Sequence, residues 1–130
     1  MKKSIEEWKK ILPHEVFHIL WNNGTEHPFT GKYVNENRTG IYHCAGCDNQ
    51  LFDSKDKFHS GSGWPSFTKP IGSNAVKNQL DLSLGMKRTE VRCAFCGGHL
   101  GHVFDDGPKP EGTRYCINSK SLKFKKKDKN

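Results

Sequence analysis

The sequence predicts a mainly β fold, with short helices near the N-terminus and a metal ion that ties the strands together. Only 33% of the 130 residues are hydrophobic and 13 are glycine, a composition that favours short strands and loops around a modest core. Four of the five cysteines form two C-x-x-C pairs, which predicts the metal site. We expect one domain, residues 1–122, followed by a poorly ordered lysine-rich tail, residues 123–130.

Residues 4–22 have helical spacing. The apolar stripe of this stretch comprises Leu12, Val16 and Leu20. Pro13 either divides the stretch into two short helices or begins the second one, and Asn22-Asn23-Gly24 predicts its end. In the rest of the chain, short runs such as residues 40–43 alternate with clusters of Gly, Asn, Asp and Pro, which predicts strands joined by tight turns.

The net charge of +7 lies largely at the C-terminus, where residues 120–130 contain six lysines and one aspartate. Such a run is typical of a solvated tail, so we expect no nucleic-acid partner. No apolar stretch is long enough to span a membrane, and the charged N-terminus lacks the apolar core of a signal peptide. We therefore expect a reducing, intracellular compartment, in which C-x-x-C pairs bind metal rather than form structural disulfides.

Cys44 and Cys47 form one C-x-x-C pair, and Cys93 and Cys96 form the other. Zinc prefers four thiolates in a tetrahedron, and each C-x-x-C turn brings two sulfurs close enough to bind one ion. Because four thiolates leave no open position, the predicted zinc is structural and joins two distant segments of the chain. Iron in the same ligand set is the alternative.

Cys116 has no cysteine left to pair with and is a candidate nucleophile. Residues 113–118 favour a strand, and alternation along that strand places Arg114, Cys116 and Asn118 on one face. A guanidinium beside the sulfur stabilises the thiolate and lowers the pKa of the thiol, as nucleophilic attack requires. The alternative is a buried, inert thiol that packs as a small apolar side chain.

A segment bracketed by glycines, residues 97–108, contains two histidines and two carboxylates. A carboxylate near an imidazole raises the pKa of the imidazole, so that a histidine can donate a proton near neutral pH. His99 and His102 lie on opposite faces of a regular strand, and both reach one site only if a bulge or turn occurs near Gly101. The alternative is a solvated hairpin without a chemical role.

Trp64 lies in a glycine-rich loop, residues 61–67. The simpler interpretation is that the Trp64 ring packs in the core. The functional interpretation is a platform, because an aromatic face attracts electron-poor methyl groups and makes favourable contacts with sulfur.

One motif near the N-terminus, His14-Glu15-Val16-Phe17-His18, matches the H-E-x-x-H pattern of zinc proteases. A protease also needs a third metal ligand and a long helix beneath a substrate cleft. The predicted helix is short and begins the chain, so we give this motif little weight.

Together these segments closely resemble the B-type methionine sulfoxide reductases, from about residue 12 to residue 122. Besides the two cysteine pairs, the resemblance covers Asn23-Gly24-Thr25-Glu26, Pro28-Phe29-Thr30-Gly31-Lys32-Tyr33, Gly63-Trp64-Pro65-Ser66-Phe67, Gly98-His99-Leu100-Gly101-His102-Val103-Phe104 and Arg114-Tyr115-Cys116-Ile117-Asn118. It implies two antiparallel β-sheets of the β-tent type, short N-terminal helices and a structural zinc far from the active site. It also implies reduction of the R epimer of methionine sulfoxide, mainly in proteins and peptides.

The resemblance also implies roles for residues that match the family's motifs. Cys116 attacks the sulfoxide sulfur and becomes a sulfenic acid, while His102 protonates the departing oxygen. Supporting catalytic roles are implied for His99, Asp106 and Asn118. Substrate contacts are implied for Trp64, Phe67, Val103 and Arg114. Arg114 has an alternative role, in which it braces its strand through a carboxylate.

One position departs from the family's pattern. Many members have a resolving cysteine just before the Gly-Trp-Pro-Ser-Phe motif, where this chain has Ser62. We therefore expect the sulfenic acid to be reduced from outside, by thioredoxin or by glutathione with glutaredoxin. We expect a monomer in the bacterial cytoplasm that acts on oxidised proteins and peptides. The competing hypothesis is a non-catalytic zinc-binding module for protein or RNA.

Overall fold

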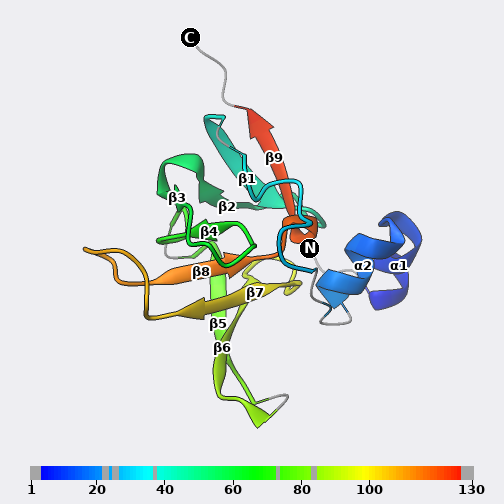
Figure 1. The fold of residues 1–130 in the computed structure, drawn as a ribbon. Helices are drawn as coiled ribbons and strands as arrows, with labels where there is room; N and C mark the ends of the chain where they lie inside the picture. The colour runs from blue at the N-terminus through cyan, green and yellow to red at the C-terminus, as the bar shows by residue number, and fades with distance from the viewer. Residues whose placement is uncertain are drawn as a thin grey trace.

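Two antiparallel sheets form the body of the protein, with two short helices packed at one side (Figure 1). The computed structural model describes residues 4–126 except 22, 23, 25, 26, 37, 73, 83 and 84. The smaller sheet has the strand order β2-β1-β9, and the larger has β3-β4-β8-β7-β6-β5. The strands are β1 Gly40–Cys44, β2 Gln50–Asp53, β3 Lys57–Phe58, β4 Ser66–Phe67, β5 Val76–Asp81, β6 Arg88–Cys93, β7 His99–Phe104, β8 Arg114–Ile117 and β9 Leu122–Lys126. This architecture confirms the predicted fold class.

The two helices, α1 Ile5–Ile11 and α2 His14–Trp21, flank Pro13, so the proline divides the helical stretch. A capping box begins α1: the Ser4 hydroxyl accepts from the Glu7 N–H at 3.2 Å, and the Glu7 carboxylate accepts from the Ser4 N–H at 2.8 Å. The indole rings of Trp8 and Trp21 stack at 5.7 Å between centroids and hold the helices together. The predicted stop signal lies partly outside the described residues.

Aromatic side chains fill the core between the two sheets. Phe67 of β4 is 0% exposed, stacks on Phe52 of β2 at 4.4 Å between ring centroids, and packs edge-on against Tyr42 of β1 at 5.1 Å. The predicted substrate contact of Phe67 is therefore wrong. The reason is strand alternation, because Ser66 is the β4 residue opposite Cys116, whereas Phe67 lies opposite Tyr115 on the core side.

The C-terminal segment differs from the predicted disordered tail, because residues 122–126 form β9 and pair with β1. Phe124 packs against Tyr42 at 4.9 Å between ring centroids, while the ammonium groups of Lys123 and Lys125 lie 3.4 and 2.7 Å from the Asp48 carboxylate. Alternating apolar and lysine residues suit an edge strand, where the lysines also discourage pairing with other chains. The last part of the predicted tail, residues 127–130, lies outside the described residues.

Candidate active site

The four paired cysteines form a metal centre between the two sheets. Their sulfur atoms all lie within 4.8 Å of one another, with 3.7 Å from Cys44 to Cys96 and 3.5 Å from Cys47 to Cys93. Thiolates at about 2.3 Å from a central zinc ion are about 3.8 Å apart in a tetrahedron, so the four side chains fit one ion. Within the described part of the chain, they form the only cluster of His, Cys, Asp or Glu side chains able to hold a metal, and the H-E-x-x-H motif makes none.

The cysteine cluster also lies at turns between the strands that carry the candidate active site. The first cysteine pair lies at the turn from β1 to β2, and the second lies at the turn from β6 to β7. Backbone and side-chain N–H groups point at the sulfurs: the Gly98 N–H donates to Cys96 Sγ at 3.4 Å, and Asn49 Nδ2 donates to Cys93 Sγ at 3.7 Å. A bound ion therefore joins the small sheet to the β6–β7 hairpin of the large one.

Cys116 of β8 lies in a cavity of about 310 Å³ on one face of the larger sheet. The side chains that line it are Ser62, Trp64, Arg88, His102, Phe104, Arg114, Cys116 and Asn118. Arg114, Cys116 and Asn118 thus share one face, as strand alternation predicts. The cavity combines a thiol, an imidazole, two guanidinium groups and two aromatic walls, which suits a small ligand with one polar atom.

The Cys116 sulfur lies 3.6 Å from the Ser62 hydroxyl. Burial raises the pKa of the Cys116 thiol, while the Ser62 hydroxyl and the Arg114 guanidinium act in the opposite direction. Arg114 therefore favours the thiolate as expected, but burial outweighs it, and the resting thiol is protonated near neutral pH.

The two histidines are brought together by a β-bulge, as their spacing requires. In the β6–β7 ladder, Arg92 pairs with His99 but Val91 pairs with Gly101, so one extra residue lies in β7. The imidazole rings of His99 and His102 consequently lie 5.5 Å apart between centroids, edge to face. His102 lies directly opposite Cys116 in the β7–β8 ladder and lines the cavity, whereas His99 is 3% exposed and lies outside the lining.

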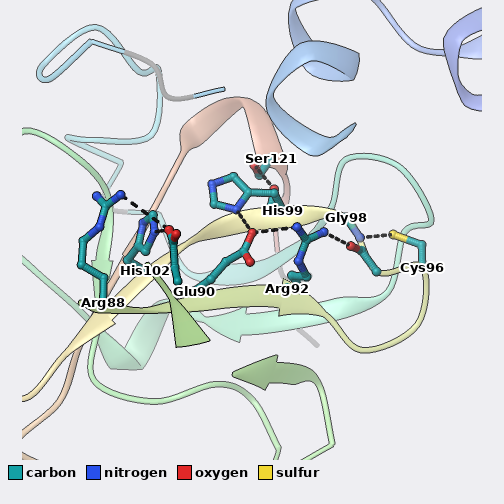
Figure 2. Close-up of polar contacts among 10 residues, drawn as sticks. Arg88, Glu90, Arg92, Cys96, Gly98, His99, His102 and Ser121 are labelled. Atoms are coloured by element: carbon teal, nitrogen blue, oxygen red, sulfur yellow. Dashed lines mark hydrogen bonds and ion pairs between the residues drawn. The ribbon is translucent and has the colours of Figure 1, made fainter. Parts of the chain in front are cut away.

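Each histidine contacts a carboxylate that the sequence did not single out. His99 Nδ1 lies 2.6 Å from Glu90 Oε2 in β6, and His102 Nε2 lies 2.8 Å from Asp81 Oδ2 at the end of β5. Figure 2 shows the Glu90 carboxylate beneath the ring of His99, with His102 to one side. Asp106, for which the resemblance implies a supporting catalytic role, contacts Arg114 and not a histidine. The missed signal was the alternation in β6, where Arg88, Glu90 and Arg92 share a face.

Asp106 instead holds Arg114. Arg114 Nε and Nη2 donate to the two carboxylate oxygens at 2.9 and 3.2 Å, and this guanidinium holds the pKa of the Asp106 carboxyl below its usual range. The same guanidinium lies over the Phe104 ring, 4.5 Å from its centroid. Arg114 therefore has both predicted features, a place in the cavity wall and a bracing carboxylate.

The remaining predicted site residues divide between the cavity and the opposite sheet face. Trp64 lines the cavity, as does Asn118, whose side-chain amide donates to the Leu100 carbonyl at 3.0 Å. Val103 pairs with Tyr115 and lines with it a neighbouring groove, which shares Arg88 and Phe104 with the cavity, so the substrate contact of Val103 stays a prediction. As the next residue after His102 in a strand, Val103 faces the other side.

In the described part of the chain, none of the helices is long and apolar enough to cross a membrane.

Comparison with known proteins extends over almost the whole chain. Residues 12–126 match the family model described as SelR domain. The chain is 56% identical to Peptide methionine sulfoxide reductase MsrB of Pseudomonas putida (strain W619), over 97% of this chain and 95% of that protein. It is 59% identical to Peptide methionine sulfoxide reductase B1, chloroplastic, of Oryza sativa subsp. japonica, over 93% of this chain and 56% of that protein. It is 52% identical to Peptide methionine sulfoxide reductase MsrB of Escherichia coli (strain K12 / DH10B), over 95% of this chain and 90% of that protein.

Proposed function

Because the chain belongs to the SelR-domain family of peptide methionine sulfoxide reductases, we propose that it reduces the R epimer of methionine sulfoxide in peptides and proteins. The observation that carries this proposal is the cavity in which Cys116 and His102 face each other beside Trp64. A non-catalytic zinc module gives no reason for a thiol, an imidazole and an indole to line one cavity. The names of the relatives also favour the reductase.

In the proposed reaction, the Cys116 thiol gives up its proton as its sulfur attacks the sulfoxide sulfur, and His102 donates a proton to the sulfoxide oxygen. The new sulfur–sulfur bond breaks as the protonated oxygen moves to Cys116, which becomes a sulfenic acid while the substrate leaves as methionine. The proton lost by the thiol replaces the one that His102 gave. Two external thiols then reduce the sulfenic acid, releasing water and forming a disulfide between themselves. The direct pairing of His102 with Cys116 across two strands supports this division between acid and nucleophile.

The walls of the cavity suit a methyl sulfoxide. We assign the ε-methyl group to the face of Trp64, where the neighbouring sulfur can also contact the aromatic ring, an interaction that contributes about 0.3–1.5 kcal/mol. Arg114 and Asn118 supply polar groups that orient the substrate or stabilise the thiolate. Asp106 acts indirectly by holding Arg114, and His99 acts indirectly through its contact with His102.

We assign zinc to the four cysteines, where it supplies a cross-link between the sheets and no step of the reaction. A tetrathiolate shell has no open position for substrate or water. We further propose a monomer in the bacterial cytoplasm, with oxidised proteins and peptides as substrates.

The direct test is turnover of the separate R and S epimers of a blocked methionine sulfoxide, with dithiothreitol as the reductant. We expect turnover of one epimer alone, and of the R epimer from the resemblance, because Cys116 attacks the pyramidal sulfur from a fixed side. With that side fixed, only one of the two epimers can place its methyl group at Trp64 and its oxygen at His102. Zinc-loaded protein that turns over neither epimer would contradict the proposed function. Equal turnover of both would contradict the assigned orientation.

The chain should behave as a one-cysteine enzyme. Ser62 contacts the Cys116 sulfur and cannot form a disulfide with it, and the other four cysteines are gathered at the metal centre. We therefore expect thioredoxin, or glutathione with glutaredoxin, to reduce the sulfenic acid. Mass spectrometry after one turnover without reductant should find Cys116 oxidised and all zinc cysteines unmodified. A disulfide between Cys116 and any of them would contradict this prediction.

A further inference from the structure

Glu90 is a buried carboxylate that lies outside the cavity lining. The residue is 6% exposed, and its Oε2 lies 2.6 Å from His99 Nδ1 and 3.0 Å from Arg92 Nη2. Figure 2 shows Glu90 between these two side chains. Moving a carboxylate out of water costs several kcal/mol, which only close charged and hydrogen-bonding partners offset. Such a group beside the acid of the active site therefore needs an explanation.

Glu90 determines which nitrogen of His99 carries the hydrogen. An ionised carboxylate only accepts hydrogen bonds, so His99 Nδ1 must be the protonated nitrogen. Burial lowers the pKa of His99, although Glu90 acts in the opposite direction, and the ring is therefore neutral near neutral pH. The charged and titratable groups that face this ring are Glu90 and Arg92 from β6 and His102 from β7.

The state of His99 matters to His102, because the two rings lie 5.5 Å apart. A positive charge on His99 at this distance opposes a second positive charge on His102. A neutral His99 places no such charge beside His102, whose Nε2 lies 2.8 Å from the Asp81 carboxylate, with Arg88 3.5 Å from that carboxylate.

We propose that Glu90 is a positioning residue, which holds His99 as the neutral Nδ1–H tautomer and thereby reserves the transferable proton for His102. This inference rests on the proposed function, because it concerns the proton of the reductase step. Glu90 acts through His99 and touches neither substrate nor Cys116.

Arg92 anchors this arrangement to the metal-binding turn. Its Nη1 donates to the Gly97 carbonyl at 2.9 Å, while its Nη2 holds Glu90. Gly97 follows Cys96 directly in the turn from β6 to β7, so closure of the turn around metal also fixes the cation that holds the carboxylate. The Glu90 side chain thus has two partners in fixed positions, as orientation of an imidazole requires.

The first experiment needs no substitution in Glu90. Long-range ¹H–¹⁵N NMR of the zinc-loaded protein reports the tautomer of each histidine, and a His99→Gln spectrum assigns the signals. We expect His99 to stay neutral with its hydrogen on Nδ1 from about pH 6 to pH 8, the range in which an ordinary histidine titrates. A hydrogen on Nε2, or protonation of His99 in this range, would overturn the proposal. This result is independent of turnover, so it stands apart from the proposed function.

The second experiment replaces Glu90→Gln, which keeps the shape but removes the charge. We expect kcat for the R epimer to fall about 10- to 100-fold, by analogy with the loss of a hydrogen-bond partner that orients a metal-bound histidine. KM should change less than about twofold, and the pH profile of kcat should shift, because the loss acts on proton transfer. Glu111→Gln is the matched control: it removes an exposed carboxylate near Lys69, and its activity should equal that of the unsubstituted chain.

Alkylation of Cys116 by iodoacetamide distinguishes a positioning role of Glu90 from a structural one. Alkylation needs the Cys116 thiolate but no proton from His102. Glu90→Gln should keep its zinc and its alkylation rate while kcat falls. An unchanged kcat and pH profile would overturn the proposal. A parallel loss of alkylation, zinc and kcat would show a structural role and would also overturn it. Absence of turnover in the unsubstituted chain would instead count against the proposed function.

Discussion

Replacing Cys116→Ser should reduce turnover of methionine-R-sulfoxide by about a thousandfold or more, as expected when the nucleophile of an enzyme is removed. The cavity already contains the Ser62 hydroxyl, 3.6 Å from the Cys116 sulfur. A serine hydroxyl in place of the thiol ionises far less readily and cannot accept the sulfoxide oxygen as a stable sulfenic acid. The measurement is steady-state turnover of the R epimer with dithiothreitol, compared with the unsubstituted chain.

The same variant must keep its fold and metal for this result to identify the nucleophile. Cys116 is partly buried at the cavity and lies outside the four-sulfur cluster, so serine should leave zinc content and thermal unfolding almost unchanged. Mass spectrometry of the Cys116→Ser variant should then find no oxidised product after incubation with substrate. Persistent turnover by this variant in its zinc-loaded form would exclude Cys116 as the nucleophile and contradict the proposed mechanism.

Local rules predicted those parts of the site that depend on one strand. Alternation places Arg114, Cys116 and Asn118 on one face, and the spacing of His99 and His102 requires the bulge that β7 contains. The C-x-x-C pairs predicted the metal cluster because chelation by two sulfurs is itself a local property of the turn. These features could be predicted because they depend on residues within one strand or one turn, and not on which strands become neighbours in the sheet.

The predictions that failed concern contacts between strands, and the sequence does not show which strands pair. Glu90 and Asp81 reach the histidines only because β6 pairs with β7 and β5 pairs with β6, whereas Asp106 is close to the histidines in sequence but binds Arg114 from β8. Phe67 was misassigned for a related reason. Its neighbour Ser66 faces Cys116, and a two-residue strand gives too little alternation to show which side is the core.

The prediction of a poorly ordered tail failed for residues 123–126, because their composition describes an edge strand equally well. Lysines that alternate with Leu122 and Phe124 solvate one side of β9 while the apolar residues pack inward. Composition alone therefore could not distinguish a solvated segment from a paired strand with a solvated face.

Replacing Cys44→Ala should abolish metal binding and unfold the protein at physiological temperature. Cys44 is 0% exposed at the end of β1 and contributes one of four sulfurs that link β1 to the β6–β7 turn. Structural zinc sites contribute about 10–16 kcal/mol of apparent binding energy, comparable to the whole stability of a domain, about 5–15 kcal/mol. Loss of one thiolate also leaves three sulfurs, of which Cys93 is buried, in place of a closed shell.

The measurement is metal content per chain together with thermal unfolding followed by circular dichroism. Cys116→Ala is the matched control, because it removes a cysteine outside the cluster and should keep one metal ion and an unchanged unfolding midpoint. Cys44→Ala that folds and unfolds like the control would contradict the structural role of the metal. Since the same turn orders β6 and β7, loss of metal should abolish turnover together with the fold, whereas Cys116→Ala should abolish turnover alone.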